Sequence, residues 1–181
     1  MHVRLKPILF FSVVFAIAGY LVFHGVGDSS TLEVGKPAPD FSVRDQSGNE
    51  LRLSDLRGNV VFLNFWATNC APCEAEMPDM EIVSQIFKGR PFRMVAISID
   101  LDWGAVSSFY KRYGITLPTY LDPGRKVFNA YRLTGTPETF IIDGEGILQR
   151  VYIGQQRWTS PQMIASFEAL IKLQTVPEGS D

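Results

Sequence analysis

Cys70 and Cys73 are the only cysteines of the chain, and they lie three residues apart in FWATNCAPCEAEMP, where an apolar run passes into a helical pattern. Residues at positions i and i+3 are neighbours on the first turn of a helix, so a disulfide can close between them without moving the backbone. The pair therefore predicts a dithiol that is oxidised and reduced reversibly.

Cys70 falls at the cap of the predicted helix, which gives the two cysteines different roles. Its sulfur faces unpaired backbone N–H groups and the positive end of the helix dipole, and both stabilise a thiolate. Because the thiolate is the attacking species in disulfide exchange, we expect Cys70 to be the nucleophile. Cys73, one turn deeper, would then resolve the mixed disulfide.

Two other uses of the pair remain open. A zinc site needs four ligands, but the chain has no third cysteine, and its only histidines, His2 and His24, lie in or beside the N-terminal apolar segment. A purely structural disulfide would close a very short loop and remove little entropy from the unfolded chain. We expect no bound metal, and no cofactor other than the Cys70–Cys73 disulfide.

The N-terminal segment has the pattern of a membrane anchor. Arg4 and Lys6 precede residues 7–23, which contain no charged side chain. A spanning helix needs about 17 to 25 residues, and positive charge before it keeps the N-terminus in the cytoplasm. The alanines of Ala16-Ile17-Ala18 offer a cleavage site, but apolar YLVF follows them, which favours an uncleaved signal-anchor over residues 1–27.

These features predict a single-pass protein of the inner (cytoplasmic) membrane with a periplasmic or extracytoplasmic domain. We divide the rest of the chain into a linker (28–36), one domain (37–174) and a tail (175–181). The hydrophobic content of 46% suffices for a core. Without Arg4 and Lys6, 15 of the 17 basic residues remain against 19 acidic ones, a net charge of −4. Such a surface gives no reason to expect a nucleic-acid partner.

The pattern along the domain predicts an α/β fold. Alternating residues around the turn Ser47-Gly48-Asn49 indicate a β-hairpin, and Gly144-Glu145-Gly146 separates two strands too close to be anything but antiparallel. The remaining predicted elements are buried strands at 60–65 and 93–100, and helices at 70–87, 106–114, 125–131 and from Ser160-Pro161 to Leu173. A strand, helix and strand in this order favour a parallel pair with a right-handed crossover.

This order, with Cys-x-x-Cys at the first helix, resembles the thioredoxin fold, and more closely the membrane-anchored TlpA/ResA/CcmG group of bacterial thiol-disulfide oxidoreductases. The resemblance covers residues 34–173 and rests on VGKPAPDF, NFWATNCAPC, the acid in CEAEMP, and GTPETFIIDGEG. It implies a thioredoxin-like fold with a mixed central sheet, flanking helices, an N-terminal β-hairpin and a central helical insertion.

The resemblance also implies four residues that support the cysteines or bind substrate, namely Trp66, Pro72, Thr136 and Pro137. Thr136-Pro137 matches the cis-proline of the fold, which leaves a backbone edge free to pair with a bound strand. An ordinary trans turn is the alternative for this dipeptide, and a core tryptophan is an equally natural interpretation of Trp66.

Glu76 matches the active-site glutamate of the group. One turn after Cys73, it could exchange a proton with that thiol, and partial burial would raise its pKa; an exposed helix glutamate is the alternative. Asn64 stands where thioredoxins have a buried aspartate, which favours Glu76 as its replacement. Asn69 replaces the usual tryptophan before the first cysteine and removes an aromatic contact surface. Pro78 matches the proline that bends the first helix.

The segment APDF and the hairpin after it also occur in peroxiredoxins. That class needs Pro and Thr seven and three residues before its reactive cysteine. Leu63 and Ala67 hold these places before Cys70, and Trp66 and Cys70 hold them before Cys73. The peroxidase pattern is absent.

We therefore predict a membrane-tethered thiol-disulfide oxidoreductase. The resemblance implies that a membrane electron-donor thiol protein reduces it, and that it reduces a disulfide in an exported substrate protein such as apocytochrome c. The direction is open, because about 30 mV corresponds to only about 1.4 kcal/mol. A copper-binding or copper-delivering protein with Cys70 and Cys73 as soft ligands is the alternative, although no histidine follows His24. A non-catalytic adhesion or scaffold role is a third possibility.

Overall fold

β3 (Val60–Trp66) lies at the centre of the sheet, and all seven of its residues are buried. Val60, Phe62 and Trp66 belong to one apolar cluster, whereas the alternate residues from Val61 to Phe65 belong to a second. A strand that is apolar on both faces must be covered on both. Its position explains why the segment VVFLNFW is an unbroken apolar run apart from one asparagine.

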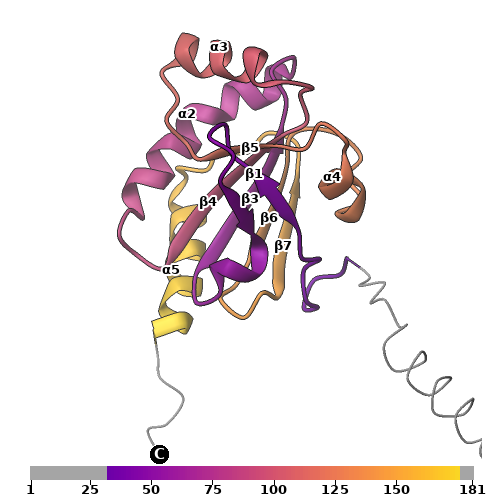
Figure 1. The fold of residues 1–181 in the computed structure, drawn as a ribbon. Coiled ribbons are helices and arrows are strands. Elements are labelled where there is room, and N and C mark those ends of the chain that lie inside the picture. Colours follow the sequence, from indigo (N-terminus) through magenta and orange to yellow (C-terminus); the bar gives the residue numbers. More distant parts are fainter. Residues whose placement is uncertain (1–31, 176–181) are drawn as a thin grey trace, which may run out of the picture. The chain divides into compact units, whose positions relative to one another are not determined.

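The computed structural model describes residues 32–175, which form a seven-stranded mixed sheet in the order β2-β1-β5-β4-β3-β6-β7 (Figure 1). The other strands are β1 (Ser42–Arg44), β2 (Glu50–Arg52), β4 (Phe92–Ser98), β5 (Thr119–Leu121), β6 (Glu138–Ile142) and β7 (Leu148–Ile153). Strands β3, β4 and β5 are parallel, and the remaining neighbouring pairs are antiparallel.

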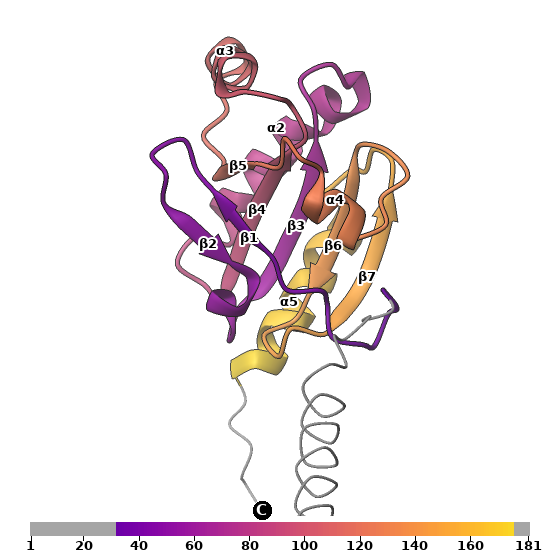
Figure 2. The same cartoon turned by 45° about the vertical axis from the view of Figure 1, so that its right-hand side comes forward.

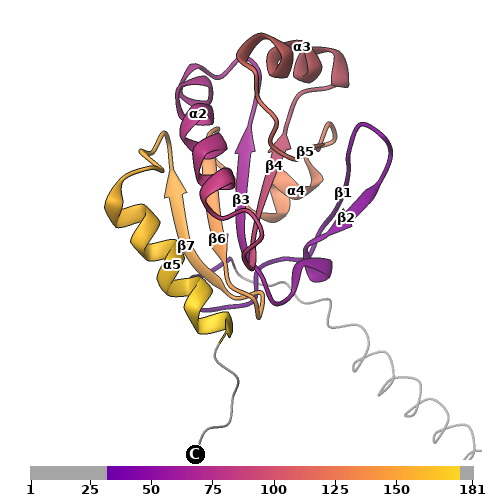
Figure 3. The same cartoon turned by 90° about the vertical axis from the view of Figure 1, so that its left-hand side faces the viewer.

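Helices cover both faces of this sheet. The helical elements are η1 (Leu53–Leu56, a 3₁₀ helix), α2 (Ala71–Ile86), α3 (Trp103–Tyr113), α4 (Lys126–Ala130) and α5 (Pro161–Thr175). Helices α2 and α5 lie on one face, and α4 lies on the other (Figures 2 and 3). The first cluster joins β3 and β4 to residues of α2, α3 and α5, and the second joins the same strands to α4 and the N-terminal hairpin segment.

The predicted α/β class, the hairpin and the parallel pair with its crossover helix are confirmed. The helix predicted from residue 106 begins earlier, at Trp103, because the Asp102 carboxylate caps it by accepting hydrogen bonds from the N–H groups of Gly104 and Ala105. Strand β5 is an addition: its three half-buried residues carry no alternating pattern, and it forms by pairing with β4.

The predicted anchor over residues 1–27, the linker up to Thr31 and the tail after Thr175 lie outside the described residues, so this division stays a prediction. Within the predicted linker, Gly35 donates a backbone hydrogen bond to Leu148, and Lys36 accepts one from it. Among residues 32–175, no helix is both long and apolar enough to cross a membrane.

Candidate active site

Cys70 and Cys73 form a disulfide at the start of α2, with Cα atoms 5.2 Å apart. Cys70 is the N-cap residue in an extended conformation, and its Sγ accepts a hydrogen bond of 3.3 Å from the N–H of Cys73. The predicted cap position is therefore confirmed. Cys73 is fully buried and Cys70 is half-buried, so Cys70 is the more accessible of the two residues. Pro72 lies exposed in the first turn, where its missing N–H costs nothing.

The loop before β6 contacts Cys70. The peptide bond between Thr136 and Pro137 is cis, as the resemblance implied. The carbonyl oxygen of Thr136 lies 3.4 Å from the Sγ of Cys70. A disulfide sulfur carries no hydrogen, so in the oxidised protein this approach is a contact and not a hydrogen bond. It places Thr136 and Pro137 beside the half-buried Cys70.

A buried carboxylate holds this loop in place. The Oε1 atom of Glu138 accepts hydrogen bonds from the Thr134 N–H (2.8 Å), the Thr134 hydroxyl (2.7 Å) and the Gly135 N–H (3.1 Å). Glu138 is only 4% exposed. The sequence analysis did not single out Glu138, because these contacts depend on how the loop folds.

Glu76 lies in the core beneath α2 and is 1% exposed, which excludes the alternative of a surface glutamate. Its Oε1 atom accepts a hydrogen bond from the Asn64 amide (3.0 Å), and its Oε2 atom accepts from the Gln156 N–H and the Trp158 indole, both at 3.1 Å. Three donors converge on one carboxyl group, which ties α2 to β3 and to the segment between β7 and α5.

Burial raises the pKa of Glu76 from 4.5 to about 7, against the opposing effect of the hydrogen bonds from Gln156, Asn64 and Trp158. Asp79, a further negative charge on α2, adds a smaller effect in the same direction as burial. A carboxyl group with a pKa near neutrality can both accept and release a proton at physiological pH.

Asn64 joins Glu76 to β6, because its amide nitrogen also donates to the Thr139 hydroxyl at 2.8 Å. The Oδ1 atom of Asn64 is buried and has no hydrogen-bond partner among the described residues. Gln156 and Trp158 were missed by the sequence analysis. They lie about eighty positions from Glu76 along the chain, and no local pattern connects them to it.

Trp66 ends β3 and is fully buried. Its ring packs against Phe109 and Tyr110 of α3, with ring centroids 5.1 and 5.6 Å apart. A buried ring cannot touch a substrate, so any contribution of Trp66 to the site comes through packing. Asn69, by contrast, is exposed beside Cys70.

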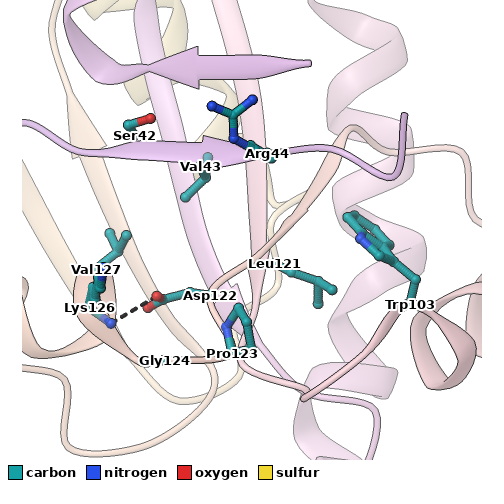
Figure 4. Close-up of a pocket in the computed structure, with 10 residues that line it drawn as sticks. All are labelled: Ser42, Val43, Arg44, Trp103, Leu121, Asp122, Pro123, Gly124, Lys126 and Val127. Carbon is teal, nitrogen blue, oxygen red and sulfur yellow. Dashed lines mark hydrogen bonds between the residues drawn. The ribbon is translucent and has the colours of Figure 1, made fainter. Parts of the chain in front are cut away.

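The surface of the described residues has hollows that neither cysteine lines. One of about 290 Å³ separates Thr68 and Glu74 from the α3 residues Phe109, Arg112 and Tyr113. Figure 4 shows another, of about 420 Å³. Its walls come from β1, the start of α3 and the segment from Leu121 to Val127. The carboxylate of Asp122 in this wall accepts hydrogen bonds from the N–H groups of Lys126 and Phe128, so it caps α4.

Within the described residues, no cluster of three or more histidine, cysteine, aspartate or glutamate side chains could hold a metal ion. The group whose geometry suits exchange chemistry is the Cys70–Cys73 disulfide. Its outer sulfur caps a helix, faces a cis-proline loop and stands at the end of a central parallel strand. On this sheet, that arrangement defines a thiol-disulfide oxidoreductase of the thioredoxin fold.

The chain belongs to the AhpC/TSA family, whose family model matches residues 34–151. It is 39% identical over 143 residues to the thiol-disulfide oxidoreductase ResA of Geobacillus kaustophilus, covering 78% of this chain and 82% of that protein. It is 36% identical over 161 residues to ResA of Bacillus subtilis, covering 88% of each.

Among solved structures, a putative thiol:disulfide interchange protein DsbE from Chlorobium tepidum matches with a TM-score of 0.68 and 29% identity, over 80% of this chain and 99% of that one. The predicted resemblance and fold class are thus confirmed, and the protein is a thiol-disulfide oxidoreductase.

Proposed function

We propose that this protein is tethered to the cytoplasmic membrane by residues 1–27 and reduces disulfides of exported proteins, with an apocytochrome c before haem attachment as the candidate substrate. The observation that carries the proposal is the position of Cys70, a half-buried sulfur at a helix cap beside a cis-proline loop. The name of the curated relatives supports the reaction class, and the charge pattern of the first 27 residues supports the membrane location.

The reaction proceeds by two thiol-disulfide exchanges. The Cys70 thiolate attacks one sulfur of the substrate disulfide, which forms a mixed disulfide and releases the second substrate sulfur as a thiolate. Cys73, as a thiolate, then attacks the sulfur of Cys70. This step closes the Cys70–Cys73 disulfide and releases the first substrate sulfur. Two electrons pass from the protein to the substrate, whose two thiolates take up protons.

Glu76 is proposed as the group that exchanges a proton with Cys73 in the second step. Support comes from its burial on the same helix and from its pKa of about 7. Thr136 and Pro137 are proposed to bind the substrate segment beside its attacked sulfur. No cofactor other than the Cys70–Cys73 disulfide enters the reaction.

A membrane thiol protein is proposed to return the electrons by the reverse sequence of exchanges. The direction of the overall reaction depends on the reduction potential, which equilibration with dithiothreitol and glutathione measures. A strongly oxidising potential would overturn the reductant proposal while leaving the exchange chemistry intact. Tight stoichiometric Cu(I) binding by the reduced protein would instead favour copper delivery.

The two cysteine variants test the proposed order of attack. Cys70→Ser should abolish reduction of insulin, because the attacking sulfur is lost. Cys73→Ser should accumulate mixed disulfides with partner proteins, since nothing remains to resolve them. Non-reducing electrophoresis and mass spectrometry of the trapped partners from membranes check both results. Equal trapping by the two variants would contradict the assigned roles, and unchanged reduction by Cys70→Ser would overturn the proposed function.

A further inference from the structure

Asp100 lies in the connection between β4 and α3, and its carboxylate gathers three hydrogen-bond donors. Its Oδ2 atom accepts from the Thr68 N–H (3.0 Å) and its Oδ1 atom from the Thr68 hydroxyl (2.7 Å). The third donor is the Ser98 hydroxyl, at 2.7 Å from Oδ2. Thr68 therefore meets both oxygens of one carboxylate, which fixes its backbone as well as its side chain.

The Asp100 end of this contact is hydrogen-bonded to the ends of β3 and β4. Ser98 ends β4, is fully buried and is paired with Trp66, the last residue of β3. The Asp100 N–H donates back to the Ser98 hydroxyl at 3.0 Å, and the Ile99 N–H donates to the carbonyl of Trp66 at 3.0 Å. The segments that follow β3 and β4 leave these neighbouring parallel strands at the same edge of the sheet (Figure 1). Asp100 is thus attached to the centre of the fold by its backbone and its side chain.

The other end of the contact is the segment that carries Cys70. Residues 67–69 form an irregular connection between β3 and α2, and Thr68 lies two residues before Cys70. The Sγ of Cys70 depends on this entry angle for two contacts. It accepts from the Cys73 N–H at 3.3 Å, and it lies 3.4 Å from the Thr136 carbonyl. A small rotation of the connection would change both distances.

We propose that Asp100 is a positioning residue for thiol-disulfide exchange: through Thr68 it sets the orientation in which the sulfur of Cys70 meets the start of α2. The inference rests on the proposed role of Cys70 as the attacking sulfur. Asp100 acts through Thr68 and does not touch the reacting atoms.

The test compares four substitutions in a reduced Cys73→Ser background, where Cys70 is the only thiol. Asp100→Ala removes the acceptor, and Thr68→Val removes the hydroxyl donor while keeping the size of the side chain. Both should lower the rate constant for alkylation of Cys70 by iodoacetamide at pH 7 by about three- to tenfold, the range that one hydrogen bond supports. Thr68→Ser keeps the donor and should stay within about twofold of the parent.

Asp143→Ala is the matched fourth variant. Asp143 is half-buried like Asp100 and also accepts from three donors, the N–H groups of Glu145 (3.0 Å) and Ile147 (2.9 Å) and the amide of Gln149 (2.6 Å), but it lies in the turn between β6 and β7. It should lower the unfolding midpoint without changing the alkylation rate.

A second readout uses the chain with both cysteines. The equilibrium constant for oxidation by glutathione should shift in Asp100→Ala and Thr68→Val and stay unchanged in Asp143→Ala. Unchanged alkylation and equilibrium in Thr68→Val, or equal changes in Asp143→Ala, would overturn the proposal. Neither readout needs a substrate protein, so a failure here is distinguishable from retained insulin reduction by Cys70→Ser, which overturns the proposed function itself.

Discussion

Glu76 combines burial in the core with a pKa near neutrality. Its carboxyl group replaces apolar contact beneath α2 with three hydrogen bonds, and its burial shifts its proton affinity into the physiological range. The unpartnered Oδ1 atom of Asn64 belongs to the same group of side chains. If Glu76 gains a proton, the Asn64 amide can turn and accept a hydrogen bond from it, so both protonation states find a partner.

The raised pKa of Glu76 makes stability depend on pH. Between about pH 4.5 and 7, the folded protein holds a proton on Glu76 that the unfolded chain releases, so the free energy of unfolding falls as pH rises through this window. The fall amounts to about 3 kcal/mol for a shift from 4.5 to about 7, and it ends above the folded pKa. Glu76→Gln should abolish it, as denaturant unfolding of the oxidised protein from pH 5 to 8 would measure.

Glu74→Gln is the control for this measurement, because Glu74 lies exposed on the same helix. It should keep the pH dependence of the parent protein. Parallel curves for Glu76→Gln and the parent would show that burial does not raise the pKa of Glu76. In the reduced protein, Glu76→Gln should also shift the pH titration of the Cys73 thiol if the two groups exchange a proton.

Among individual residues, the sequence predicts those whose partners lie nearby in the chain. The cap position of Cys70 and its pairing with Cys73 follow from spacing alone. The partners of Glu76 and the contact between Thr68 and Asp100 do not, because each joins segments that only the assembled sheet brings together. The resemblance identified Glu76 without indicating what surrounds it.

Among the elements, α5 closes the apolar cluster on the face that α2 shares. Phe167 of α5 is 1% exposed and packs its ring near those of Phe62, Phe87 and Phe92, with centroids 5.8, 6.1 and 5.8 Å away. These aromatic contacts link α5 to β3, β4 and the end of α2. The end of α2, the helix that carries the disulfide, therefore packs against α5, the last helix of the described chain.

Replacing Phe167 with alanine should lower the free energy of unfolding by about 3 to 5 kcal/mol, because a large ring leaves a cavity that rigid neighbours fill poorly. Leu173→Ala, at an α5 side chain that is 70% exposed, should change it by no more than about 0.5 kcal/mol. Guanidinium unfolding of the oxidised protein measures both. Similar losses in the two variants would mean that α5 contributes through helix formation and not through this cluster.

The elements predicted from sequence are those whose pattern is long or whose boundary is marked by a cap. The terminal helix was predicted from Ser160-Pro161, and it begins at Pro161. β5 was not predicted because three residues after Pro118 are too few to show alternation. It is a strand because it pairs with Ala96 to Ser98 of β4 and with Arg44 of β1. α3 begins at Trp103 and not at residue 106, because the Asp102 carboxylate caps it.

For the molecule as a whole, residues 32–175 supply two apolar clusters, one on each face of the sheet. A chain lacking residues 1–31 should therefore fold and reduce insulin at the rate of the full protein. The full chain should fractionate with membranes, whereas the truncated chain should not, because the apolar segment is gone. Loss of turnover on truncation would show that the N-terminal segment takes part in the reaction, and a full chain found outside the membrane fraction would contradict the anchor.

Gly35 and Lys36 form backbone hydrogen bonds with Leu148 at the end of β6 that lies away from Cys70. Leu148 pairs with Ile142 at one end of β6, whereas Thr136 and Pro137 precede the opposite end, and the Thr136 carbonyl contacts Cys70. The start of the described chain therefore lies at one end of β6, and the Cys70 sulfur lies near the other. If residues 1–27 anchor the chain as proposed, lengthening the stretch before Gly35 would leave the surface around Cys70 unchanged, because Gly35 and Cys70 contact opposite ends of β6 and its neighbouring segments.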